Sequence, residues 1–235
     1  TGDLGGTWTI HDSSSSEGTV WKADLNKDAW QLFLNYQEEM PARWPNANFS
    51  DGTALNDEEY WAHGTVDIDD YQTNSTATCS DGMTKYQDGS KYYCLNYLNG
   101  ELEDDNGTYL GHDGLINSGL NATGAIAVLN IGSFRTWSRN ITSHNLSNGS
   151  FTFEEVPTSE WKIKHHMYFI TQKLELLDVP GEWFFDHESE TNTVYYMPRD
   201  DENPNEMDIR MKTKPYAMLC SDSDGITVEG FDYFA

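Results

Sequence analysis

Residues 174–197 read LELLDVPGEWFFDHESETNTVYYM, and this stretch holds the clearest strand pattern of the chain. Its segments 183–185 and 194–197 are rich in the aromatic and β-branched residues that strands favour, and an acidic turn separates them. We therefore predict a hairpin here. The segment before it, residues 165–177, is the best helix candidate, and Pro180 and Gly181 provide its stop signal.

Outward from this hairpin, the hydrophobic pattern mostly has a period of two, which indicates strands. Residues 30–44 read as a second hairpin, and the continuous apolar run 125–131 has the length of a buried strand. Residues 67–120 are rich in Asp, Gly, Asn and Ser and are predicted to be a loop-rich insertion. Further strands are expected at 19–22, 60–66, 151–154, 207–210 and 226–231. The predicted fold class is mainly β with one short helix.

The stretch 174–197 resembles the segment by which secreted right-handed parallel β-helix proteins of the pectin-lyase-like type enter their coils. Residues 226–231, ITVEGF, resemble one rung of such a coil, and residues 31–34 and 42–46 resemble the β-sandwich insertion of the same proteins. The resemblance implies a β-sandwich-like domain over residues 1–160, including the insertion 67–120. It implies that residues 161–235 supply the helix, the hairpin and the first rung of a parallel β-helix.

A single rung cannot bury its own apolar face, because a solenoid coil needs neighbouring coils for stability. The apolar residues of 207–234 therefore lack partners within these 235 residues. We expect either a longer part of the same chain or another copy of it to supply them. Stacking of copies would be a head-to-tail contact that does not close, which builds a filament.

The charge of the chain excludes some classes of partner. Fourteen Lys and Arg stand against 39 Asp and Glu, so the formal net charge is −25. A nucleic-acid binder needs a basic surface, which this composition argues against. The sequence also lacks an apolar run of the roughly 18 residues that a membrane span requires, so we expect no membrane insertion.

Seven Asn-x-Ser/Thr acceptors suggest a secreted or cell-surface glycoprotein that carries covalent N-glycans. An Asn- and Ser-rich bacterial chain with unused acceptors is the alternative. The chain begins without a signal peptide, so secretion would make it a mature or excised segment. The acceptors are Asn48, Asn74, Asn106, Asn121, Asn140, Asn145 and Asn148.

The three cysteines fit an oxidising compartment. Cys79 and Cys94 flank a turn-rich stretch, and a disulfide between them would stabilise the fold by about 3 kcal/mol. Cys220 is then left over, either as a free thiol or as a bond to another chain. The preceding Ala-Met-Leu favours a buried free thiol.

Two groups of residues could carry carbohydrate chemistry. Asp178 and Glu182 lie in the segment 174–197, and glycosidases use a pair of carboxylates. A structural role for both residues at the entry to the coil is the simpler interpretation. The segment Arg43–Trp44 together with Trp61 and His63 could form a platform for sugar stacking, but the simpler interpretation is that both tryptophans are core and Arg43 pairs with a nearby Asp. No residue is assigned as catalytic.

Three acidic clusters, at 67–70, 103–107 and 222–225, offer the oxygen ligands that calcium prefers, but none has the EF-hand spacing. Solvated acidic loops are the simpler interpretation, so no cofactor is expected and Ca²⁺ is the alternative. The sequence has no His-Glu-x-x-His, Cys-x-x-Cys, Gly-x-Ser-x-Gly or phosphate-binding loop motif.

These observations predict a non-catalytic, N-glycosylated structural subunit of an extracellular filament or coat, of the flagellar-hair kind, that assembles through apolar β-helix ends. The alternative is a fragment of a secreted carbohydrate-active β-helix enzyme, either a glycoside hydrolase or a polysaccharide lyase. A carbohydrate-binding module is a third interpretation.

Overall fold

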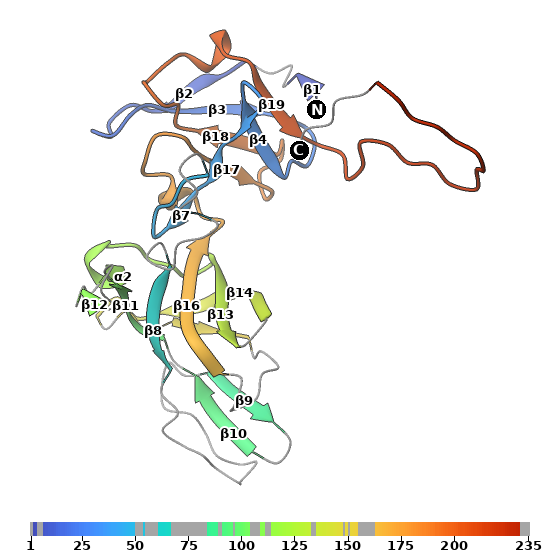
Figure 1. Cartoon of the computed structure of the whole chain (residues 1–235). Helices are drawn as coiled ribbons and strands as arrows, with labels where there is room; N and C mark the ends of the chain where they lie inside the picture. The colour runs from blue at the N-terminus through green and yellow to red at the C-terminus, as the bar shows by residue number, and fades with distance from the viewer. Residues whose placement is uncertain are drawn as a thin grey trace. The chain divides into compact units, whose positions relative to one another are not determined.

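The computed structural model describes the chain in two compact units, which are treated separately (Figure 1). Unit 1 comprises Thr1–Pro41 and Leu177–Ala235, and unit 2 comprises Ala42–Leu176. These units differ from the expected division at residue 160, because the two ends of the chain join in unit 1. The described residues are 2–3, 7–49, 54, 61–66, 84–88, 91–95, 97–103, 109–110, 114–132, 135–147, 149, 151–154 and 163–230.

Unit 1 contains two sheets. The first has the order β1-β19-β4-β5, and the second has the order β2-β3-β18-β17-β6. The pairing between β6 and β17 is parallel, and the other pairings described in unit 1 are antiparallel. The strands are β1 (Gly2–Asp3), β2 (Thr9–Asp12), β3 (Val20–Asp24), β4 (Gln31–Leu34), β5 (Gln37–Glu38), β6 (Met40–Pro41), β17 (Glu182–Asp186), β18 (Thr193–Tyr196) and β19 (Ile209–Lys212).

One apolar core joins the two sheets of unit 1. Leu32 and Met211 come from the first sheet, and Trp183, Val194 and Tyr196 come from the second. All five are buried members of the same cluster. Side chains of a strand alternate between its two faces, so each sheet turns one apolar face inward. Unit 1 is therefore a β-sandwich built from both ends of the chain.

The hairpin predicted within residues 183–197 is confirmed in unit 1, whereas the one predicted at 30–44 is confirmed only for β4 and β5, because Met40–Pro41 pair with β17 and Arg43–Trp44 pair with residues 170–171. Strands β17 and β18 pair antiparallel, with Phe184 opposite Tyr195. Strands β4 and β5 are joined by Asn35 and Tyr36, which have φ values of 49° and 67°. Two residues with positive φ define a type I′ turn, whose twist suits a two-residue hairpin.

Unit 2 is built around an eight-stranded sheet of order β12-β11-β15-β14-β13-β16-β7, in which β8 pairs with β11 and β16. Strands β9 and β10 form a separate pair. The elements are β7 (Arg43–Trp44), β8 (Ala62–Val66), β9 (Thr84–Asp88), β10 (Lys91–Leu95), β11 (Tyr97–Glu103), β12 (Tyr109–Leu110), α2 (Gly114–Asn117), β13 (Ile126–Gly132), β14 (Arg135–His144), β15 (Phe151–Phe153) and β16 (Ile163–Thr171). The predicted apolar strand at 125–131 is thus confirmed as β13.

The predicted helix at 165–177 is wrong. Its first part belongs to β16, which pairs with β13 along one side and with β7 and β8 along the other. Burial of Tyr168 and Ile170 in the sheet overrides the helix-like spacing of the apolar residues. The remainder forms only a 3₁₀ turn, Leu174–Leu176.

The predicted loop-rich character of 67–120 is also wrong in part, because β9, β10, β11, β12 and α2 lie in that range. The described residues do not show a parallel β-helix, since their sheets are mostly antiparallel. Residues 226–229, expected as a rung, belong to no strand. Residues 182–212 instead complete the sandwich of unit 1 by pairing with N-terminal strands.

Candidate functional site

Arg43 lies in the interior of unit 2. It stands on β7 opposite Thr171 of β16, and only 2% of its surface is exposed. Its Nε donates a hydrogen bond of 2.9 Å to the Pro45 carbonyl oxygen. The guanidinium carbon lies 3.9 Å from the ring centre of Phe169 and 6.0 Å from that of Trp61, which are cation–π distances.

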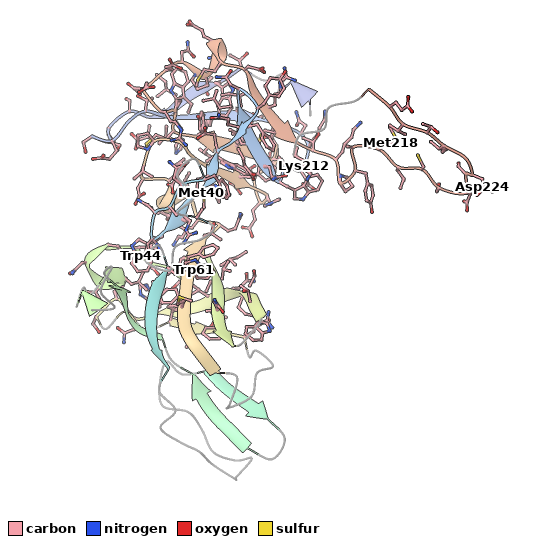
Figure 2. All side chains as sticks on the ribbon, in the orientation of Figure 1. Met40, Trp44, Trp61, Lys212, Met218 and Asp224 are labelled. Carbon is pink, nitrogen blue, oxygen red and sulfur yellow. The ribbon has the colours of Figure 1, made fainter. Side chains whose placement is uncertain are left out.

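The two tryptophans of the predicted sugar platform, labelled in Figure 2, are half-buried in unit 2 and pack against aromatic rings of β16. The ring of Trp61 meets Phe169 edge to face at 4.9 Å, and Trp44 lies 6.2 Å from buried Tyr168. The structure places His63 in β8 opposite Met167 and describes only its backbone. The burial of Arg43 and the packing of both tryptophans favour the core interpretation over a sugar platform.

An ion pair between buried Glu39 and half-buried Arg199 lies in unit 1, next to the segment 174–197. Glu39 is 3% exposed, and its Oε2 accepts bonds of 3.0 Å and 3.2 Å from Nη2 and Nε of Arg199. Burial raises the pKa of the Glu39 carboxyl above its ordinary value, although the hydrogen bonds and the charge of Arg199 act in the opposite direction. Sequence reasoning missed this pair because its members are 160 positions apart.

The residues of the segment 178–183 tie this ion pair into the sandwich. Gly181 has a φ of 91°, and the guanidinium of Arg199 lies over it so closely that a Cβ would be 2.7 Å from Cζ. Trp183 donates from its indole nitrogen to the Glu39 carbonyl oxygen at 3.0 Å. Glu182 is 1% exposed, whereas Asp178 is exposed. The two carboxylates proposed from the sequence thus lie in different environments, and the burial of Glu182 favours a structural role for it.

Residues 214–230 form a continuous exposed stretch without helix or strand. Five large apolar side chains on it are exposed: Tyr216 at 63%, Met218 at 44%, Leu219 at 71%, Ile226 at 52% and Val228 at 43%. Figure 2 labels Met218 and Asp224 on this stretch, which we call the C-terminal segment.

Cys220 lies in the same segment, where it is an exposed free cysteine, so the expected burial of its thiol is wrong. Of the predicted disulfide, Cys79 lies outside the described residues, and Cys94 is described only as backbone in β10. The pairing therefore stays a prediction.

Three of the predicted glycan acceptors, Asn121, Asn140 and Asn145, are exposed, and Asn48 is half-buried. The side-chain oxygens of Asn121 and Asn145 accept bonds from backbone N–H groups two residues on, so both begin local turns. Asn74, Asn106 and Asn148 lie outside the described residues.

The predicted calcium clusters remain predictions. Residues 67–70 and 104–107 lie outside the described part of the chain, and residues 222–225 are exposed. Among the residues that the structure describes, no group of three or more His, Cys, Asp or Glu side chains could hold a metal ion. Within the same part, no helix is long and apolar enough to cross a membrane.

No protein-family model matches this chain. No curated protein matches it either. A solved structure titled "Glycoside hydrolase" is similar to it with a TM-score of 0.41 and 20% sequence identity, over 84% of this chain and 29% of that one. The chain thus spans less than a third of the length of that protein.

Proposed function

We propose that this chain is a non-catalytic, N-glycosylated structural subunit of an extracellular assembly, and that copies of it associate through the C-terminal segment. The exposure of five large apolar side chains within residues 214–230 is the observation that carries this proposal. Isolated apolar residues are normal on protein surfaces, but a contiguous group of them is typical of an interaction site.

The spacing of these residues suits association as an extended strand. Tyr216 and Met218 are two positions apart, as are Ile226 and Val228, so each pair falls on one face of an extended backbone. A strand added to a neighbouring sheet gains backbone hydrogen bonds, while alternate side chains fill pockets. In the parallel β-helix interpretation, the segment is a coil whose neighbouring coil comes from a second copy.

The energetics favour a weak contact that gains strength by repetition. Full burial of a large apolar side chain contributes about 1.5–3 kcal/mol, so half-exposed ones gain roughly 1 kcal/mol each. Five of them give about 5 kcal/mol, which is at the lower end of what association costs in lost freedom. We therefore expect concentration-dependent association, and an open-ended head-to-tail geometry would extend it into a filament.

The net charge of the chain predicts how association depends on salt concentration. Each copy carries a formal charge of −25, so copies repel one another at low ionic strength. Salt screens this repulsion within about 10 Å at 0.1 M and leaves apolar contacts intact. Association should therefore strengthen as salt is raised, in contrast to an assembly held by ion pairs.

The test is sedimentation velocity of residues 1–235 at increasing protein concentration, in low and high salt. The variants Leu219→Asp and Ile226→Asp place a charge within the segment, and Leu146→Asp is the matched control because Leu146 is 53% exposed in unit 2. We expect species larger than a dimer for the wild type and the control, and monomers for the two segment variants. A wild type that stays monomeric at every concentration and salt level, or segment variants that associate like the control, would overturn the proposal.

A further inference from the structure

The outer face of the second sheet of unit 1 carries a row of rings. Residues 183, 185, 194 and 196 turn their side chains into the core, so Phe184 and Tyr195 between them project from the opposite face. These two residues stand directly opposite each other on β17 and β18, with ring centres 6.0 Å apart and ring planes 33° apart. His11 of β2 meets Tyr195 edge to face at 4.9 Å. We call these three side chains the aromatic stripe; β3 lies between β2 and β18 (Figure 1) and places Lys22 opposite Tyr195 on the same face.

Two carboxylates flank the aromatic stripe on the same face. Asp24 stands opposite Thr193, which in turn stands opposite Asp186, so the three residues form the next cross-strand row. Burial is the largest cause that raises the pKa of the Tyr195 phenol, and the charges of Asp186 and Asp24 raise it further. Both carboxylates therefore lie within electrostatic reach of the Tyr195 hydroxyl. Two strand spacings of about 4.8 Å put the carboxylates roughly 10 Å apart.

Each of the two carboxylates is held in place by hydrogen bonds to one of its oxygens, Oδ1. Oδ1 of Asp24 accepts hydrogen bonds from the hydroxyls of Thr191 and Thr193 at 2.8 Å and 2.9 Å. These bonds lower the pKa of Asp24, so it remains ionised at neutral pH. Oδ1 of Asp186 accepts bonds from the backbone N–H groups of residues 188 and 189. In each case Oδ2 remains to accept a hydrogen bond from a ligand.

We propose that the aromatic stripe, with Asp24 and Asp186, binds a neutral polysaccharide chain on this face of the sheet. A pyranose ring has an apolar C–H face that packs on aromatic rings, and hydroxyls around its rim that donate to carboxylates. The carboxylates lie roughly 10 Å apart across the strands, one on each side of Thr193, so both can accept hydrogen bonds from hydroxyls of one chain. The net charge of −25 disfavours an acidic polysaccharide, because like charges repel.

This assignment differs from the sugar platform expected from the sequence. The Arg43 group packs within unit 2, whereas Phe184 and Tyr195 are half-buried on a sheet face and His11 is exposed. The proposal does not depend on association of the chain, since it uses no residue of the C-terminal segment.

The test is affinity electrophoresis of the full chain in gels that contain hydroxyethyl cellulose as a neutral polymer or polygalacturonate as an acidic one. The variants are Tyr195→Ala, Phe184→Leu and the double variant Asp24→Asn with Asp186→Asn. Tyr36→Ala is the matched control, because Tyr36 is a 53% exposed aromatic residue elsewhere in unit 1. Phe184→Leu retains an apolar side chain, so it keeps the test valid if Tyr195→Ala fails to fold.

We expect the neutral polymer to retard the wild type and the control. Tyr195→Ala should weaken binding roughly 5- to 150-fold, the range found when an aromatic residue that stacks on a nucleobase is replaced by alanine. Phe184→Leu and the double variant should weaken it severalfold. The proposal is overturned if the neutral polymer does not retard the chain, if the acidic polymer retards it equally, or if Tyr36→Ala loses as much binding as Tyr195→Ala.

Discussion

Replacement of Arg199 by Met should destabilise unit 1 by about 2 kcal/mol at neutral pH, because it leaves the Glu39 carboxylate buried without its cation. Breaking a buried ion pair costs about 3–5 kcal/mol when one charge stays behind. The side chain of Arg199 is 36% exposed, whereas that of Glu39 is 4% exposed. Water reaches this pair from the arginine side, so we reduce the expected cost to about 2 kcal/mol. Methionine keeps most of the side-chain volume over Gly181, so the loss reports mainly on the charge.

The destabilisation caused by Arg199→Met should depend on pH, because it requires Glu39 to be ionised. A carboxyl whose pKa is raised by folding contributes stability below its unfolded value of about 4.5, and loses that contribution as pH rises through the folded pKa. Removal of Arg199 raises the pKa of Glu39 further, because burial is then less strongly opposed. The cost of Arg199→Met should therefore be about 2 kcal/mol near pH 7 and markedly smaller near pH 4, where Glu39 is protonated in both proteins.

Urea unfolding, followed by hydrogen exchange at the Gly181 and Met197 amides, would localise the effect. The Gly181 N–H donates to the Met197 carbonyl oxygen at 2.7 Å, and the Met197 N–H donates to the Glu182 carbonyl oxygen at 3.0 Å. Arg210→Met is the matched control, because Arg210 pairs with Asp208 at 2.8 Å where both side chains are 33% and 42% exposed. We expect at most about 1 kcal/mol from that control. A loss no larger than in the control, or one that is equal at the two pH values, would refute the argument from burial.

Three other predictions follow from backbone geometry, packing and exposure. Gly181→Ala and Gly225→Ala should each cost about 1–2 kcal/mol in urea unfolding from their φ values of 91° and 70°. Gly181→Ala should cost more than Gly225→Ala, because its Cβ would lie 2.7 Å from the Arg199 Cζ and would displace the guanidinium from Glu39, whereas Gly225 has open space around it. Leu129→Ala should destabilise unit 2 by about 2–5 kcal/mol, since Leu129 is 0% exposed, whereas Leu146→Ala should change thermal stability by less than about 0.5 kcal/mol. The thiol of Cys220 should react with a thiol reagent in native buffer, and the Cys220→Ser variant should lose that reaction; a thiol that reacts only in denaturant would contradict the exposed position.

Local patterns predicted only part of the strands: they missed β2, β14 and β16 and assigned β9 to β12 to a loop-rich insertion. The hairpin at β17 and β18 and the apolar strand β13 are visible in the sequence as runs of strand-forming residues. Pairing was harder to predict, because β3 joins β18 and β4 joins β19 across most of the chain. The helix prediction failed for the same reason, since the neighbours of β16 in the sheet decide its conformation and its own sequence does not reveal them.

The candidate sites, too, depend on contacts between residues that are distant in the sequence. The sequence could not show which groups contact Arg43, because Phe169 and the Pro45 carbonyl reach it only through sheet pairing. The prediction that the apolar residues of 207–234 lack partners agrees with the exposure of Met218, Leu219, Ile226 and Val228. It is wrong for Met207 and Ile209, which pack in the core of unit 1. The aromatic stripe was not foreseeable, since His11 and Tyr195 meet only once β2, β3 and β18 are paired.

Residues 174–197 therefore contribute to the architecture of unit 1, and their contacts give no evidence of an activity. Gly181 bonds to Met197 and lies beneath Arg199, and Trp183 bonds to Glu39, so the contacts of this segment close the sandwich of unit 1. A search for function should then concentrate on surfaces that the sandwich does not use. The C-terminal segment and the aromatic stripe are two such surfaces, and they can be separated experimentally. If both proposals hold, Leu219→Asp should abolish association and leave retardation by hydroxyethyl cellulose unchanged, whereas Tyr195→Ala should do the reverse.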